Sequence, residues 1–101
     1  MIAINDVPLF KPGQIVATPG AIAELERANQ NVWQFVSLHL AGDWGVVEAD
    51  DKKANDEALR DGSRLLSAYV LKTGVKIWII TEAENDNGKR EVTTVLLPDE
   101  Y

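Results

Sequence analysis

Residues 64–98, RLLSAYVLKTGVKIWIITEAENDNGKREVTTVLLP, decide the fold. Three segments of this stretch are rich in β-branched and aromatic residues, and turn-forming residues separate them. Thr73 and Gly74 predict a tight hairpin, and the polar sequence ENDNGK predicts a wider one. The stretch therefore predicts three antiparallel strands that follow one another as a meander.

The first hairpin also predicts which side chains share a face of the sheet. If residues 73–74 form a two-residue loop, Lys72 lies opposite Val75 and Tyr69 lies opposite Trp78. This register turns one apolar set toward the helices: Leu66, Ala68, Val70, Ile77 and Ile79. It turns a set of mixed rings, hydroxyls and charges to the other face: Leu65, Ser67, Tyr69, Leu71, Lys76, Trp78, Ile80 and Glu82.

The segment before this stretch predicts helices. Thr18 has the side chain of an N-cap, so we expect a first helix over residues 19–28. A second helix over residues 32–40 follows Asn29 or Asn31 as its N-cap. Both helices carry apolar residues at helical spacing, which predicts that one face of each packs on the sheet.

The second helix is apolar on more than one side, because Trp33 and Leu38 extend its apolar face. This pattern predicts a largely buried helix, with Gly42 where a C-terminal cap belongs. A third helix begins at Asp50 or Asp51, since acidic residues favour a helix N-terminus, and it ends at Gly62. On this helix Asn55 lies one turn from Leu59, so it is either solvated or reaches inward.

The size of the chain limits it to one core. With 101 residues and 46% apolar composition, we expect a single α+β domain over residues 1–101. Residues 1–14 contain two prolines and a glycine and predict an extended arm. Two to three helices would pack on the three-stranded sheet, with residues 2–4 or 15–17 as an added edge strand.

Charge and composition restrict the partners. The formal charge of −6 disfavours generic nucleic-acid binding, but an acidic surface could imitate nucleic acid and occupy a DNA-binding enzyme. No apolar run is long enough to span a membrane, and MIAINDVPLF lacks the features of a secretion signal, so we expect a cytoplasmic protein. A homodimer is possible, because a second copy could add burial to so small a core.

His39 is the only histidine and the only side chain that ordinarily titrates near neutral pH. It is therefore the candidate general acid or base. Its place near the end of a helix also suits a structural role, in which it caps carbonyls or favours the helix dipole. With one histidine and no cysteine, a zinc site cannot be completed, and no cofactor motif occurs. We therefore expect neither a metal nor a cofactor.

The sequence GDWG, residues 42–45, predicts a turn. Asp43 can accept a hydrogen bond from the downstream backbone, and the glycines tolerate a positive φ. Trp44 must either tuck into the core or present its ring to a partner. The motif is therefore explained by structure alone, although a binding role for Trp44 stays open.

Several polar residues on the predicted sheet resemble those of a small ribonuclease: Arg64, Ser67, Tyr69, Glu82, Thr93 and Thr94. In that hypothesis His39 is the acid or base, Arg64 holds the phosphate, and Glu82 supports the reaction together with Ser67 or Thr93. The structural alternative is an ordinary cross-strand ion pair between Arg64 and Glu82.

Five segments together resemble a group of short bacterial proteins known as plasmid-related or restriction-associated proteins. They are GQIVATPGAIAEL, the GDWG turn after His39, NDEALRDGSRLLSAY, KIWIITEAE and TTVLLPDEY. The resemblance implies a setting in mobile genetic elements and their conflict with host defence, but no activity. In that group an Asp-Arg pair leads directly into the threonines, whereas here a longer loop displaces Arg90, so no role for this arginine is implied.

Two functional hypotheses follow. In the first, the protein is a small, non-enzymatic interaction or regulatory protein that binds a protein partner. Its anchors would be Trp44, Tyr69 and Trp78, supported by Asp43 and Ser67, with the acidic helix as a charged rim. In the second, it is a metal-independent ribonuclease of the toxin kind. Enzymatic activity is thus open, and it requires His39, Arg64 and Glu82 to meet in one pocket.

Overall fold

The computed structural model describes residues 8–101. It contains three α-helices and one four-stranded sheet, with strand order β1-β4-β3-β2, which confirms the α+β class. The sheet is mixed, so the predicted three-stranded antiparallel sheet is only partly matched. Along the chain the elements are β1 (Gln14–Ala17), α1 (Pro19–Ala28), α2 (Val32–Leu40), α3 (Ala49–Asp61), β2 (Leu65–Val70), β3 (Lys76–Thr81), β4 (Val92–Leu96) and the 3-10 helix η2 (Pro98–Glu100).

The added strand is β1, which confirms the prediction for residues 15–17. It pairs with β4 in parallel, with Ile15 opposite Thr93 and Ala17 opposite Val95. The alternative strand over residues 2–4 lies outside the described residues, as does the first half of the predicted arm. The chain runs from β1 through α1, α2 and α3 before it returns to the sheet at β2, and this long connection permits the parallel pairing of β1 with β4.

The predicted register of the β2–β3 hairpin is wrong by one residue. Leu71 N–H donates to the carbonyl of Val75 at 2.8 Å, so residues 72–74 form a three-residue loop in which Gly74 has φ +90°. Tyr69 therefore lies opposite Ile77. Because side chains alternate along a strand, the shift turns β2 over. The residues of β2 and its end that face the helices are Leu65, Ser67, Tyr69 and Leu71, while Ile77 and Ile79 of β3 face them as predicted.

The helix boundaries follow their caps. α1 has the predicted bounds, and Thr18 Oγ1 accepts a hydrogen bond from the Ala21 N–H at 3.1 Å. Asn31, not Asn29, caps the start of α2. The third helix begins at Ala49, slightly before the predicted start, and ends at Gly62 in the left-handed region. None of the helices in residues 8–101 is long and apolar enough to cross a membrane.

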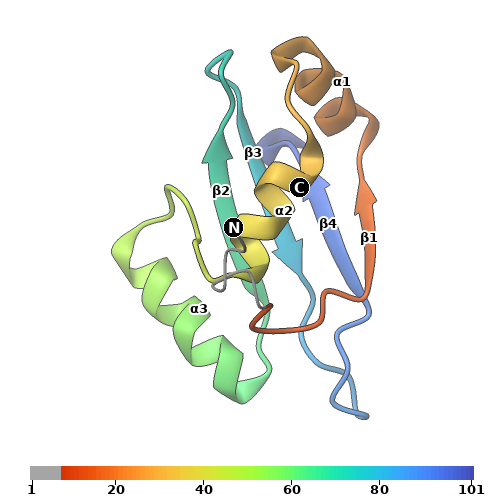
Figure 1. Ribbon diagram of the computed structural model, residues 1–101. Coiled ribbons are helices and arrows are strands. Elements are labelled where there is room, and N and C mark those ends of the chain that lie inside the picture. Colours follow the sequence, from red (N-terminus) through yellow and green to blue (C-terminus); the bar gives the residue numbers. More distant parts are fainter. Residues whose placement is uncertain (1–7) are drawn as a thin grey trace, which may run out of the picture.

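The core lies between the sheet and the first two helices. In Figure 1, α2 crosses one face of the sheet, α1 lies near the ends of β1 and β4, and α3 lies beside β2. The prediction of a largely buried α2 is wrong, since Trp33 is 56% exposed and Leu38 is 36% exposed. The buried apolar cluster of this layer consists of Ala21, Leu25, Ala28, Phe35, Val36, Tyr69, Leu71, Ile77, Ile79 and Val95.

The outer edge of β2 is covered by hydrogen bonds. The Asn55 side chain of α3 accepts from the Leu66 N–H at 3.0 Å and donates to the Leu66 carbonyl at 2.7 Å. Asn55 thus reaches inward and is 3% exposed. Two residues further along, Ala68 bonds in the same way to the backbone of Trp44 and Val46. An edge that is satisfied by its own chain is a poor template for a foreign strand.

Candidate functional site

His39 lies in the interior, between α2 and the sheet. It follows Phe35 by one helical turn, so it shares the buried face of α2, and its side chain is 0% exposed. Both ring nitrogens have hydroxyl partners on neighbouring strands. Nδ1 lies 2.5 Å from Ser67 Oγ, and Nε2 lies 2.9 Å from Thr81 Oγ1.

The hydroxyl chain beyond His39 fixes its tautomer. Thr93 Oγ1 donates to the carbonyl of Pro12 at 2.8 Å and also lies 2.7 Å from Thr81 Oγ1. Thr93 donates its single hydroxyl proton to the carbonyl of Pro12, so Thr81 must be the donor in the hydrogen bond between the two threonines. Thr81 therefore accepts from His39, which places the ring proton on Nε2 and leaves Nδ1 to accept from Ser67. We call these five residues the His39 network.

The same surroundings keep the imidazole neutral. Burial, and then the positive charge of Arg90, lower the pKa of His39 from 6.5 to about 4. The rings of Phe10 and Trp44 meet the imidazole edge-on, with centroids 5.3 and 5.8 Å away. At neutral pH the side chain is thus uncharged, fully hydrogen-bonded and enclosed, which suits a structural role and leaves no access for a substrate.

The three candidate catalytic residues do not meet. Leu65 and Thr81 face the helices, so their strand neighbours Arg64 and Glu82 belong to the opposite side of the sheet from His39. Arg64 donates to the hydroxyl of Tyr101 and lies 5.4 Å from the centre of its ring. Among residues 8–101 it forms no ion pair with Glu82, so the predicted cross-strand pair is also absent.

Most of the predicted binding anchors are buried. Trp44 is 4% and Tyr69 is 5% exposed, and Ser67 belongs to the His39 network. Trp44 Nε1 donates to Asp56 Oδ1 at 3.1 Å, and the Tyr69 hydroxyl donates to the carbonyl of Asp43 at 2.6 Å. Burial also raises the pKa of Tyr69. Two of the three predicted rings therefore hold the fold together and do not form a surface.

The GDWG segment is a turn that delivers Trp44 to the interior. Asp43 Oδ1 accepts from the Gly45 N–H at 3.2 Å. Gly45 has φ +76°, and a Cβ at this position would overlap the carbonyl of Ala68. This close approach lets the segment pair with β2, so the glycine is required by the geometry.

Trp78 keeps part of its surface on the sheet face opposite the helices. Its ring packs edge-on against Tyr101 at 5.8 Å between centroids. The acidic helix α3, which was predicted to surround the rings, lies beside β2. Trp44, Tyr69 and Trp78 therefore do not form one contiguous surface.

A groove between α1 and α2 contains an exposed ring that the sequence argument placed in the core. Trp33 and Ile22 are 56% and 47% exposed, and they line a cavity of about 460 Å³ together with Leu25 and Val32. Helical spacing could have revealed Trp33, because it precedes Phe35 by only two residues and so points to another side of α2. We call this surface the α1–α2 groove.

Arg90 is the second residue that sequence reasoning missed. It is 7% exposed, and its guanidinium joins segments that are far apart in the sequence. Nη1 donates to the carbonyls of Ser63 and Glu82 at 2.7 and 3.0 Å, and Nη2 donates to the carbonyl of Ala58 at 3.0 Å. The guanidinium carbon also lies 5.8 Å from the centre of the Phe10 ring.

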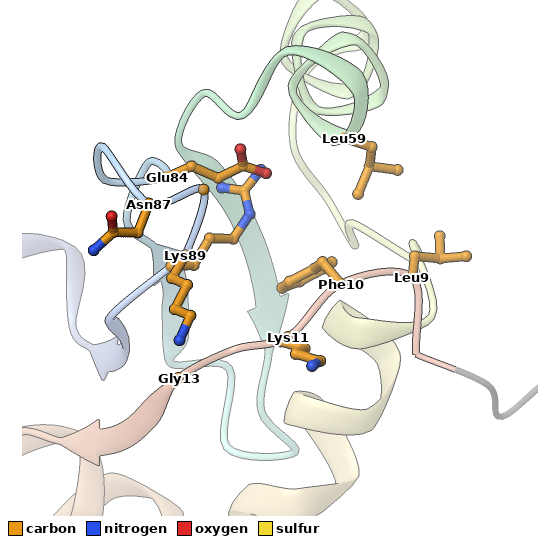
Figure 2. Close-up of a pocket in the computed structure, with 10 residues that line it drawn as sticks. Leu9, Phe10, Lys11, Gly13, Leu59, Glu84, Asn87 and Lys89 are labelled. Carbon is orange, nitrogen blue, oxygen red and sulfur yellow. The ribbon is translucent and has the colours of Figure 1, made fainter.

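Arg90 lines a cavity of about 660 Å³ between the segment before β1, the end of α3 and the β3–β4 loop. Figure 2 shows Leu9 and Leu59 on one side of Phe10, and Glu84, Asn87 and Lys89 on the other. We call this cavity the Arg90 pocket. It combines an apolar wall of Leu9, Phe10 and Leu59 with three cationic side chains and the carboxylate of Glu84.

Comparisons with models of known protein families, with curated proteins and with solved structures found no match for this chain. The resemblance to plasmid-related and restriction-associated proteins therefore stays a prediction. Within residues 8–101 no three acidic or histidine side chains are grouped so that they could hold a metal ion. The α1–α2 groove and the Arg90 pocket are therefore the features that bear on function.

Proposed function

We propose that this protein is a non-enzymatic interaction protein that binds a basic protein partner through the α1–α2 groove. The observation that carries the proposal is the exposure of Trp33 beside an apolar cavity. Tryptophan is among the residues that contribute most to protein interfaces, and it contributes most when it inserts into or borders a pocket. Trp33 is also accessible without any rearrangement of the core.

The groove has the form of a docking site for an apolar side chain. Ile22 of α1 and Trp33 of α2 form its accessible walls, and Leu25 lies at its buried side. Polar side chains of Glu26, Gln30 and Asn31 also line the cavity. An apolar centre with polar residues around it matches the usual organisation of a protein interface.

The charge around the groove supports a basic partner. Glu24 and Glu26 lie on α1, where Arg27 is the only cation and already bonds to Glu24 at 2.7 Å. Glu100 adds another carboxylate beside the start of α1, because it accepts a hydrogen bond from the Thr18 hydroxyl at 2.6 Å. The net charge of −6 would increase the rate at which a basic protein associates.

The setting in mobile genetic elements rests on the resemblance of the sequence alone. A basic partner agrees with it, because a DNA-binding enzyme presents a cationic surface that an acidic protein can occupy. The ribonuclease alternative has less support, because His39 is enclosed and Arg64 and Glu82 lie on the other side of the sheet.

The test compares two tryptophan variants of the tagged full chain. Wild type, Trp33→Ala and Trp78→Ala are used to capture proteins from a bacterial lysate at low and at high salt. Trp78 is the matched control, because it is a tryptophan with an accessible part on the opposite side of the sheet. We expect a basic protein that wild type and Trp78→Ala retain, that Trp33→Ala loses, and that high salt releases.

Other outcomes would count against the proposal. Loss of the captured protein with Trp78→Ala but not with Trp33→Ala would move the interface to the outer sheet face. Retention of the captured protein by both variants would show that neither Trp33 nor Trp78 contributes to the interface. The absence of any basic protein on wild type, or cleavage of added RNA that depends on His39, would overturn the non-enzymatic binding function itself.

A further inference from the structure

We infer that the Arg90 pocket binds a small organic anion, in which a carboxylate or phosphate is attached to an apolar body. This inference goes beyond the proposed protein-binding function and depends on different residues. It begins from the charge of Arg90. No carboxylate among residues 8–101 forms an ion pair with this buried guanidinium. Asp61 interacts with this charge only through space, and Glu84 lines the same cavity without pairing with it. A buried charge without a direct ion pair is costly, and a bound oxyanion would supply that direct partner.

The guanidinium also retains hydrogen-bond donors. It has five N–H groups, of which three donate to carbonyls of residues 8–101. The Nε–H and one Nη2–H have no acceptor there. Nε is not completely enclosed by protein atoms, so a ligand can reach it. Because Arg90 lines the cavity, these donors are positioned for an oxyanion, for which arginine is the preferred ligand.

The rest of the pocket matches such an anion at both ends. Lys11 and Lys89 add two cations, against the single carboxylate of Glu84, so this site is locally positive in a protein whose net charge is −6. Leu9, which is 55% exposed, and Leu59 offer an apolar surface that an inorganic ion would not use. The volume of about 660 Å³ is in the range of small-molecule sites.

The test is an NMR titration of the ¹⁵N-labelled full chain with phenyl phosphate and with benzoate. Phenol and benzamide are the neutral counterparts, and inorganic phosphate is the anion without an apolar body. We expect at least one organic anion to cause saturable shifts of the Arg90 Nε–H and of the amides of residues 9–11 and 87–90. The neutral compounds should cause none, and inorganic phosphate should bind at least about tenfold more weakly.

Variants locate the site without disturbing the core. Lys89→Ala and Lys11→Ala should each weaken binding by about three- to tenfold, because each removes one cation from the rim. Lys72→Ala is the matched control, since it removes an exposed lysine in the β2–β3 loop, whereas the pocket includes the β3–β4 loop at the other end of β3, and it should leave the affinity unchanged. Arg90→Lys should abolish binding, and if it fails to fold, the two rim variants still decide the question.

Three results would overturn the inference. The first is the absence of saturable shifts with both organic anions at millimolar concentration. The second is equal binding of the neutral counterparts or of inorganic phosphate, which would remove the need for the charge or for the apolar body. The third is an equal effect of Lys72→Ala and Lys89→Ala, which would indicate general charge attraction.

Discussion

His39 and Arg90 are both buried, and both contact the ring of Phe10, yet they are satisfied in opposite ways. His39 is neutral, and each of its nitrogens has a hydroxyl partner. Arg90 carries a permanent charge, has no ion-pair partner among residues 8–101 and keeps two free donors beside a cavity. Burial alone therefore does not distinguish a structural side chain from a ligand-binding one, whereas the remaining donors and the lack of a direct ion pair do.

The largest effect on stability is expected from Arg90→Ala. The substitution removes the hydrogen bonds from Arg90 to the carbonyls of Ala58, Ser63 and Glu82, of which Ala58 keeps the Gly62 N–H as a donor. We expect a loss of about 3–5 kcal/mol in the free energy of unfolding. Urea denaturation measures it. Arg60→Ala, on the exposed side of α3, is the control and should stay within about 0.5 kcal/mol of wild type. A loss below about 1 kcal/mol would mean that Arg90 does not hold these segments together.

The next effect is the pH dependence that His39 contributes. The unfolded chain binds a proton at His39 below pH 6.5, whereas burial and Arg90 delay protonation in the folded chain to a pKa of about 4. Stability from this group is therefore complete above pH 6.5 and falls as the pH decreases toward 4, by roughly 3 kcal/mol in total.

Denaturation of wild type and His39→Gln between pH 7 and pH 4 measures this contribution. His39→Gln should be less stable at pH 7 but should lack the histidine part of the slope. Asp61 and Glu100, whose pKa values are lowered chiefly by hydrogen bonds to Ser63 and to Thr18, contribute equally to both proteins. Parallel pH profiles would show that His39 is not protected from protons in the folded state.

Asn55 extends the comparison to an uncharged buried side chain, whose amide both donates a hydrogen bond to Leu66 and accepts one from it. Asn55→Ala removes its two hydrogen bonds to Leu66, so we expect a loss of about 1–2 kcal/mol, together with faster hydrogen exchange at the Leu66 amide. Hydrogen-exchange NMR separates this local effect from global unfolding. Unchanged exchange at Leu66 would show that the edge of β2 does not depend on α3.

The smallest effect on stability is expected from Lys89→Ala. Lys89 is exposed and forms no ion pair among the described residues, so the free energy of unfolding should change by less than about 0.5 kcal/mol. Thermal denaturation measures it. Together with the predicted loss of anion binding, this result would separate the ligand-binding part of the pocket from the structural part. A larger loss of stability would assign the lysine to the fold.

The helices were predictable because their caps are local. Thr18 and Gly62 mark helix ends by the chemistry of single residues, and both do so in the structure. The register of β2 was not predictable in this way. Lys72, Thr73 and Gly74 fit a two-residue loop as well as a three-residue loop that ends on glycine, and the choice decides whether Tyr69 is exposed or buried.

The candidate sites depend on contacts between distant parts of the chain. Burial of His39 follows from its spacing to Phe35, but its two hydroxyl partners lie on two different strands, β2 and β3. Arg90 reaches carbonyls in the last turn of α3, in the α3–β2 loop and directly after β3, and no periodic pattern contains that information. The same is true of the Arg90 pocket, whose walls meet only in the folded chain.

The proline carbonyl at the end of the His39 network makes the imidazole a sensor of the chain before β1. As long as Pro12 accepts from Thr93, Thr81 donates to Thr93 and accepts from His39, so the ring proton stays on Nε2. If this segment moves away, Thr93 can donate to Thr81 instead, and the Nδ1–H tautomer becomes accessible. The segment also forms a wall of the Arg90 pocket. The ¹⁵N shifts of His39 in the isotope-labelled chain should thus report movement of that wall from inside the core, without an attached probe.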